Sequence, residues 1–170
     1  MPKAIKLFVK YVDAVNYAVG RFAMYLFFVL GGVLIYATLS RVLAGVPINW
    51  AIELSQFVLS AYYLLGGAYS MQLNGHVRMD LLYADRSPRS RALTDAITIL
   101  FVIFYLVVLF MGGLSATNYA IVYGQKNYSS WAPLLWPIKV IMTFGIFLML
   151  LQTISIFFKD IAAARGTPIE

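Results

Sequence analysis

The sequence has no cysteine and only one histidine, His76. The missing thiols exclude disulfides, iron–sulfur clusters, thiolate metal sites and cysteine nucleophiles within this chain, and a single histidine excludes haem held by two of its histidines. Charge is also scarce: Asp, Glu, Lys and Arg make up 12% of the 170 residues, whereas soluble domains have about 25%. Apolar residues are abundant, at 62% hydrophobic with a mean hydropathy of +0.81. This composition excludes a soluble globule and indicates one membrane domain.

Four long stretches carry no ionisable side chain, and each is long enough for a spanning helix of ~20 residues. From them we predict an all-α integral membrane protein with four transmembrane helices at about residues 22–40, 54–74, 97–119 and 134–158. The uncharged stretch around the third span is longer than a bilayer requires, so its end is assigned to a loop. Pro133 and Pro137 make the start of the fourth helix irregular. Residues 1–170 then form a single membrane domain.

Lysine and arginine are distributed unequally between the two sides of such a domain. Ten of the 13 fall in the first segment, the middle loop and the last segment, whereas Arg41, Lys126 and Lys139 fall in the other two loops. By the positive-inside rule, both termini and the middle loop are cytoplasmic, and the two other loops face the periplasm or exterior. The net charge of +6 therefore follows from topology, and no nucleic-acid partner is expected.

Residues 1–20 have the pattern of an amphipathic helix that precedes the first span. Its polar face comprises Lys3, Lys6, Lys10, Asp13 and Asn16. Its apolar face comprises Ile5, Phe8, Val12, Val15 and Val19. We expect this helix to lie in the membrane interface, with Lys3, Lys6 and Lys10 toward anionic phospholipid headgroups. A frayed tail that only sets orientation is one alternative, and a cleavable signal peptide, with an apolar region of ~7–15 residues, is another.

The sequence contains no phosphate-binding glycine loop, zinc-ligand spacing or serine–histidine–acid arrangement, so we predict no catalytic residue, metal or cofactor. Polar residues within the spans are mostly hydroxyls and amides, which usually bond neighbouring helices. They are Gln56, Ser60, Ser70, Gln72, Ser115, Thr117, Asn118, Thr143 and Gln152. Glycine pairs at 31–32, 66–67 and 112–113 let helices approach closely, within this chain or against a partner.

Ionisable residues at the ends of the spans are the candidates for a functional role. Glu53 follows Trp50 by three residues at the outer start of the second span. A lone carboxylate there needs a cation or water, and Arg41 at the end of the first span is the nearest cation. The alternative is that Glu53 binds a coupling proton or ion, although such sites are expected near the bilayer midplane.

The inner end of the second span carries His76, Arg78 and Asp80. In a continuing helix His76 and Asp80 share a face, so Asp80 can orient the imidazole, while Arg78 can reach a headgroup or a partner carboxylate. A solvated helix end explains the same residues equally well. The basic turn that follows contains Arg86, Arg89 and Arg91, for which we predict contact with lipid headgroups.

These residues resemble the small membrane subunit of tripartite ATP-independent periplasmic (TRAP) transporters, the DctQ-like family. The family pattern has an arginine closing the first span, Trp-x-x-Glu opening the second, Gly-x-His-x-Arg-x-Asp closing it, and then Pro-Arg. This chain has those elements in order at Arg41, Trp50 with Glu53, residues 75–80, and Pro88 with Arg89. The segment 131–139 is similar to the tryptophan and proline region before the family's fourth span. The resemblance covers about residues 20–158, with one departure at Ile52, where many members carry a second acid.

The resemblance implies an accessory subunit in the bacterial inner membrane. In that family a much larger multi-span subunit carries an organic acid together with sodium, a periplasmic binding protein delivers the substrate, and the small subunit braces the immobile scaffold. Arg41, Trp50, Glu53, His76, Arg78 and Asp80 are then expected to hold helix ends or the partner, and Lys126 to meet the binding protein. The alternatives are a self-sufficient oligomeric transporter or channel that uses Glu53, and an intramembrane enzyme subunit that uses His76.

Overall fold

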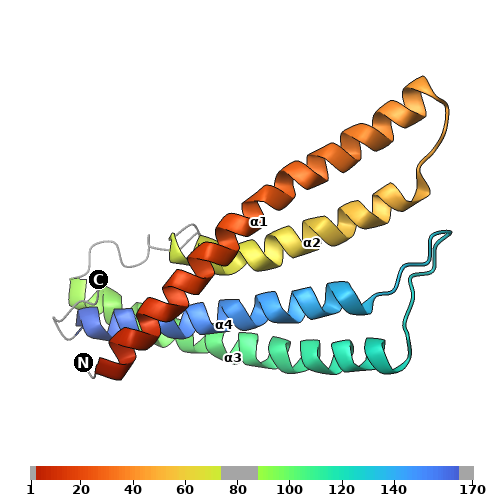
Figure 1. Cartoon of the computed structure of the whole chain (residues 1–170). Helices are drawn as coiled ribbons and strands as arrows, with labels where there is room; N and C mark the ends of the chain where they lie inside the picture. Colours follow the sequence, from red (N-terminus) through yellow and green to blue (C-terminus); the bar gives the residue numbers. More distant parts are fainter. Residues whose placement is uncertain (1–2, 74–87, 165–170) are drawn as a thin grey trace.

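The computed structural model describes residues 3–73 and 88–164, which fold into four α-helices joined in sequence. They are α1 (Lys3–Leu43), α2 (Asn49–Gln72), α3 (Pro88–Val122) and α4 (Trp136–Ala164). α1 begins and α4 ends at one end of the molecule, and the loops after α1 and α3 lie at the other end (Figure 1). Below, these are called the terminal end and the loop end. The arrangement agrees with two termini on the same side of a membrane.

Three of the helices are long and apolar enough to cross a membrane: α1, residues 97–122 of α3, and residues 136–163 of α4. α2 is not among them, since Glu53, Gln56 and Gln72 lower its hydropathy. The predicted all-helical membrane architecture is therefore confirmed. The assignment of α2 as a fourth span, and the side that each end faces, stay predictions.

α1 differs from the sequence-based expectation in being one continuous helix of 41 residues. The predicted interfacial helix and first span join without a break, and at 1.5 Å per residue the helix is ~62 Å long. The polar face predicted for its first half is also partly wrong, because Asn16 is 1% exposed. Val9 and Val12 are buried as well. The pattern could not distinguish a face that lies on lipid from one that packs on another helix.

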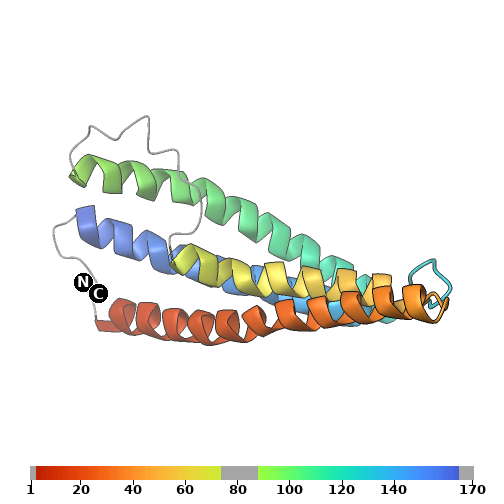
Figure 2. The same cartoon turned by 90° about the horizontal axis from the view of Figure 1, so that it is seen from above.

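α4 is the helix around which the others are arranged. It contacts α1, α2 and α3, and α2 also packs along α1. Within residues 3–73 and 88–164, α3 contacts no helix other than α4. Toward the terminal end α4 lies between α1 and α3 (Figure 2), and toward the loop end the α1–α2 pair diverges from the α3–α4 pair (Figure 1).

Small residues set how closely these helices approach one another. A Cβ added to Gly145 of α4 would lie 2.8 Å from the Leu64 carbonyl oxygen of α2. Gly67 meets Met149 and Gly113 meets Thr143 in the same way, so one glycine of each of these predicted pairs packs inside the domain. The residues 31 and 32 have nothing within 4 Å of an added Cβ.

Candidate functional site

At the loop end, Trp50 closes the hairpin formed by α1 and α2. Its ring stacks on Tyr36 of α1, with ring centroids 6.5 Å apart and an interplanar angle of 27°. Trp50 is still 37% exposed. The residue predicted to anchor a helix end therefore packs against the neighbouring helix while part of its ring faces outward.

Glu53 lies one turn further along α2 and is buried, with 7% of its surface exposed. Its Oε2 atom is buried and has no hydrogen-bond partner within the described part of the chain. Arg41, the cation expected to be nearest, forms no ion pair with Glu53 in the structure of residues 3–73 and 88–164. Arg41 is exposed in the last turn of α1, whereas Glu53 is on the buried face of α2.

The second loop forms a short hairpin that presents Lys126. An isolated antiparallel bridge pairs Lys126 with Leu134, and the Leu135 amide donates to the Gln125 carbonyl at 2.9 Å. The Lys126 side chain is exposed. Lys139 is different, because its Nζ donates to Gln125 Oε1 at 2.7 Å and so ties the start of α4 to this loop. Of these two lysines, Lys126 is thus the exposed one that lies in the loop, and Lys139 belongs to α4.

At the terminal end, Lys3, Lys6 and Lys10 are exposed on α1, as a headgroup-binding role requires. Arg89 and Arg91 belong to the beginning of α3, and their side chains lie outside the described residues. The remaining predicted positions, His76, Arg78, Asp80 and Arg86, also lie outside the described residues.

The structure reveals a polar network at the terminal end that the sequence analysis missed. Its centre is Gln152 of α4, which is 0% exposed. Asn16 Nδ2 donates to Gln152 Oε1 at 2.6 Å, and Gln152 Nε2 donates to Asp13 Oδ1 at 3.0 Å. Lys159 Nζ pairs with Asp13 Oδ2 at 2.5 Å, and Ser155 Oγ donates to Asp13 Oδ1 at 3.2 Å. Two residues of α1 are thus held by three residues of α4.

α2 joins this network through Gln72, whose Nε2 donates to the Asp13 backbone carbonyl at 3.3 Å. The spacing of the residues was a usable signal, because Gln152, Ser155 and Lys159 lie on one face of a helix, as do Asp13 and Asn16. The expectation that span amides bond neighbouring helices is confirmed for Gln72 and Gln152. In apolar surroundings, polar side chains on two helices hydrogen-bond each other, because lipid tails offer no hydrogen-bond partner.

A second polar contact joins α3 to α4 closer to the loop end. The hydroxyl oxygens of Thr117 and Thr143 are 2.9 Å apart, and Thr143 also donates to the Lys139 carbonyl at 2.9 Å. This pair confirms the expected packing role for both threonines. Polar groups of α4 therefore hold α1 and α3, and Gln72 of α2 bonds α1.

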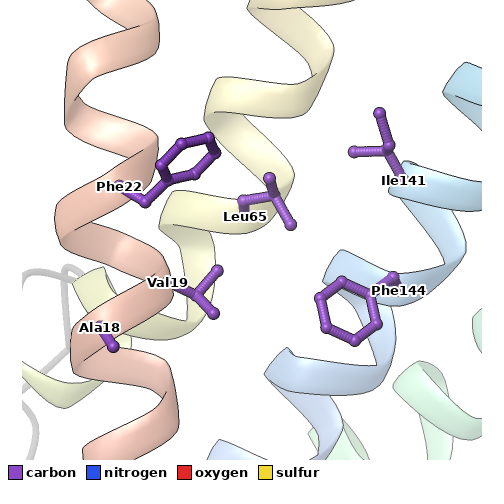
Figure 3. Close-up of a pocket in the computed structure, with 6 residues that line it drawn as sticks. All are labelled: Ala18, Val19, Phe22, Leu65, Ile141 and Phe144. Carbon is purple, nitrogen blue, oxygen red and sulfur yellow. The ribbon is translucent and has the colours of Figure 1, made fainter.

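Apolar grooves lie between the helices. The first, of about 380 Å³, opens between α1 and α4 over Leu65 of α2. Figure 3 shows Phe22 and Val19 of α1 facing Ile141 and Phe144 of α4 across this gap. A second groove of about 320 Å³ lies between α3 and α4 and shares Phe144, and a third of about 420 Å³ lies between the beginning of α1 and the end of α4. Their linings are almost wholly hydrocarbon, which suits lipid or apolar side chains.

Comparison with known families decides among the interpretations. The family model of the DctQ component of tripartite ATP-independent periplasmic transporters matches residues 30–163. The chain belongs to the DctQ family. The match covers α2, α3, nearly all of α4 and only residues 30–43 of α1, and it includes both loops at the loop end. No curated protein and no solved structure matches the chain.

Membership makes this DctQ protein a transmembrane component of a TRAP transporter and not an enzyme. The family is defined by a tripartite system, so a DctQ chain works with other components. Among the residues that the structure describes, no three His, Cys, Asp or Glu side chains lie close enough to hold a metal ion.

Proposed function

We propose that this DctQ chain is the scaffold subunit of a TRAP transporter in a bacterial inner membrane. It braces a much larger membrane subunit, which takes up an organic acid with sodium after a periplasmic binding protein has delivered it. The observation that supports this role most directly is the family match over residues 30–163.

The way in which the chain uses its polar groups is consistent with bracing. Asn16, Gln152, Thr117 and Thr143 bond one helix to another, and the grooves between helices present hydrocarbon. A desolvated organic anion and its coupling ions need charged or polar ligands near the midplane. We assign those ligands to the large subunit.

In this proposal both termini face the cytoplasm and the two loops of the loop end face the periplasm. Lys3, Lys6 and Lys10 then lie on the inner side, where they meet anionic phospholipids, and Lys126 lies on the side from which the binding protein approaches. His76, Arg78, Asp80, Arg86, Arg89 and Arg91 belong to the inner side in the same topology.

Reconstitution into lipid vesicles tests the proposal. Uptake of the substrate should require this chain, the large subunit and the binding protein together, and omission of any one of them should abolish it. Substrate accumulation by vesicles that contain this chain alone would contradict the scaffold role.

A self-sufficient transporter is the second candidate, because Glu53 holds a buried carboxylate oxygen without a hydrogen-bond partner. That candidate requires Glu53 to bind the coupling ion. Glu53→Gln would then abolish uptake or change its ion stoichiometry, whereas the scaffold role leaves the stoichiometry unchanged.

A further inference from the structure

One carboxylate near the loop end has no counter-charge among the described residues. Glu53 is 7% exposed, and its Oε2 atom is buried without a hydrogen-bond partner. Residues 34–60 and 118–145, which form this end of the molecule, are all described, and their other charged residues are Arg41, Lys126 and Lys139. Arg41 and Lys126 are exposed and form no ion pair with Glu53 in the described chain, and Lys139 bonds Gln125 instead. A counter-charge for Glu53 must therefore come from outside this end of the chain.

Glu53 belongs to a short polar stripe on α2. Gln56 follows it by three residues and Ser60 by seven, so the three side chains share one side of the helix. Gln56 is exposed, and only its backbone carbonyl is used within the described chain, by the Ser60 hydroxyl at 2.8 Å. α2 is also the helix that falls short of the apolar character of the three candidate spans. This side of α2 is consequently better suited to a polar partner than to lipid.

The stripe begins where α4 no longer covers α2. Leu64 of α2 packs against Gly145 of α4, and at 100° per residue Glu53 points within ~20° of the same direction. Glu53 lies eleven residues from Leu64 toward the loop end, whereas α4 extends only nine residues from Gly145 in that direction, to Trp136. The α1–α2 pair also diverges from the α3–α4 pair there (Figure 1). The helix that packs on this side of α2 further down therefore ends before it reaches Glu53.

We propose that Glu53 and Gln56 bind a basic side chain, arginine or lysine, of the large subunit; this inference rests on the proposed scaffold function. Burial of a carboxylate without a counter-charge carries a large desolvation cost, which a cation from the partner offsets. The exposed amide of Gln56 lies one turn from the carboxylate and adds a second acceptor oxygen. A guanidinium, which has five N–H donors in a fixed fork, can bond both groups at once.

The burial of the carboxylate indicates a partner that stays assembled. A desolvated ion pair is stable only where packing keeps water out, and a permanent subunit interface provides such packing. The binding protein instead docks from the aqueous side and leaves again. A metal ion fits this site less well, because hard cations take about six oxygen ligands and no three His, Cys, Asp or Glu side chains gather in the described chain. A basic side chain of the large subunit is thus the occupant that matches the site.

Copurification of variants with the large subunit tests this inference. Glu53→Gln keeps the size of the side chain and removes its charge, whereas Glu53→Asp keeps the charge. Ser55→Ala is the matched control, because Ser55 is also buried, at 8% exposed, and its Oγ atom also lacks a partner in the described chain. Each variant is measured twice, as the isolated chain in thermal unfolding and as the assembled complex in copurification and dissociation.

The effect of Glu53→Gln should differ between the two measurements. The isolated variant should be at least as stable as the unmodified chain, because it loses a buried charge that has no counter-charge. In the complex, dissociation should become roughly tenfold faster or more, because the basic side chain of the partner is left unpaired. Glu53→Asp should lose several-fold less, and Ser55→Ala should assemble like the unmodified chain. Uptake per assembled complex should keep its ion stoichiometry.

A suppressor series then identifies the partner group. In the Glu53→Gln background, basic residues in the membrane segments of the large subunit are replaced by methionine one at a time, and one replacement should restore assembly, because neither charge is then left unpaired. Assembly of Glu53→Gln at the unmodified level, or the absence of any restoring replacement, would overturn the proposal. So would an isolated Glu53→Gln variant that unfolds more easily than Ser55→Ala, since the carboxylate would then have a partner inside this chain. In these cases the scaffold role survives, whereas failure of the unmodified chain to copurify would refute the scaffold role itself.

Discussion

Gln152 offers the most direct test of the polar network, because it is fully buried and bonds both Asn16 and Asp13. We predict that Gln152→Leu loosens α1 from α4. The substitution removes two hydrogen bonds and leaves Asn16 Nδ2 with only the Leu148 carbonyl, at 3.5 Å. The Asp13 carboxylate keeps its contacts with Ser155 and Lys159, so the loss is concentrated on the amide of Asn16.

Two terms set the size of the effect. Hydrogen bonds between membrane helices contribute ~0.6 kcal/mol on average and up to ~1.7 kcal/mol. A buried donor left without a partner costs ~1–3 kcal/mol. Since leucine partly offsets these losses with its own apolar burial, we expect the free energy of unfolding to fall by about 1–3 kcal/mol.

The measurement is unfolding of the purified chain in detergent, followed by circular dichroism during heating or titration with a denaturing detergent. Gln56→Leu is the matched control, because Gln56 is exposed on α2. It should change stability little. The double variant Asn16→Leu with Gln152→Leu should lose less than the sum of the two single variants, since removal of both partners leaves no orphan amide. Additive losses, or a Gln152→Leu variant as stable as the Gln56→Leu control, would refute the network's role.

Three further predictions concern packing and the loop end. Gly145→Ala should lower the free energy of unfolding by ~1–3 kcal/mol, because the added Cβ would meet the Leu64 carbonyl. The control Gly66→Ala, whose added Cβ has nothing within 4 Å, should be neutral or stabilising. Equal stabilities of the two variants in thermal unfolding would contradict the close approach of α2 and α4. Lys126→Glu should raise the binding-protein concentration needed for half-maximal uptake by roughly 1.5- to 5-fold, and more strongly at low salt, without reducing the amount of membrane complex. An unchanged concentration dependence at low salt would remove Lys126 from the docking surface. Glu53→Gln should leave substrate preference and ion stoichiometry in vesicle uptake as they are, and a change in either would assign Glu53 to transport.

Much of the fold could be predicted from hydropathy and charge, since a lipid bilayer favours long apolar helices regardless of which helices pack beside them. The predicted spans 22–40 and 97–119 lie within α1 and α3, and the span 134–158 overlaps α4 from residue 136 onward. The continuity of α1 could not be predicted, because an amphipathic segment has the same sequence pattern whether it lies on a bilayer surface or packs against a neighbouring helix. Val12 was placed correctly on an apolar face, yet that face packs inside the domain.

The candidate site was predicted less well, for a reason that Glu53 and Asp13 make clear. Sequence reasoning sought a partner for Glu53 among the cations near it at the loop end and named Arg41, whereas Arg41 is exposed and Glu53 is buried. Asp13 was assigned to a solvated face with the lysines, although its partner Lys159 is 146 residues away in the sequence. Pairings over such distances depend on which helices are neighbours, and hydropathy carries no information about that.

The order of groups in the polar network follows the expected depth in the membrane. Measured along α4 from Trp136, Gln152 lies ~24 Å from the loop end and Lys159 ~35 Å from it. In a bilayer whose ~30 Å hydrocarbon core begins at Trp136, the amide of Gln152 would lie inside the apolar layer and the ammonium of Lys159 in the headgroup region. Neutral amides thus make the deeper contacts, and the ion pair of Asp13 with Lys159 lies where water reaches it, at side-chain exposures of 20% and 32%. An ion pair at the depth of Gln152 would carry a large desolvation cost, whereas amides there form bonds that water cannot replace. The network therefore fixes the position of α1 along α4 as well as the contact between them, because Asp13 and Asn16 meet Gln152, Ser155 and Lys159 together in one register only.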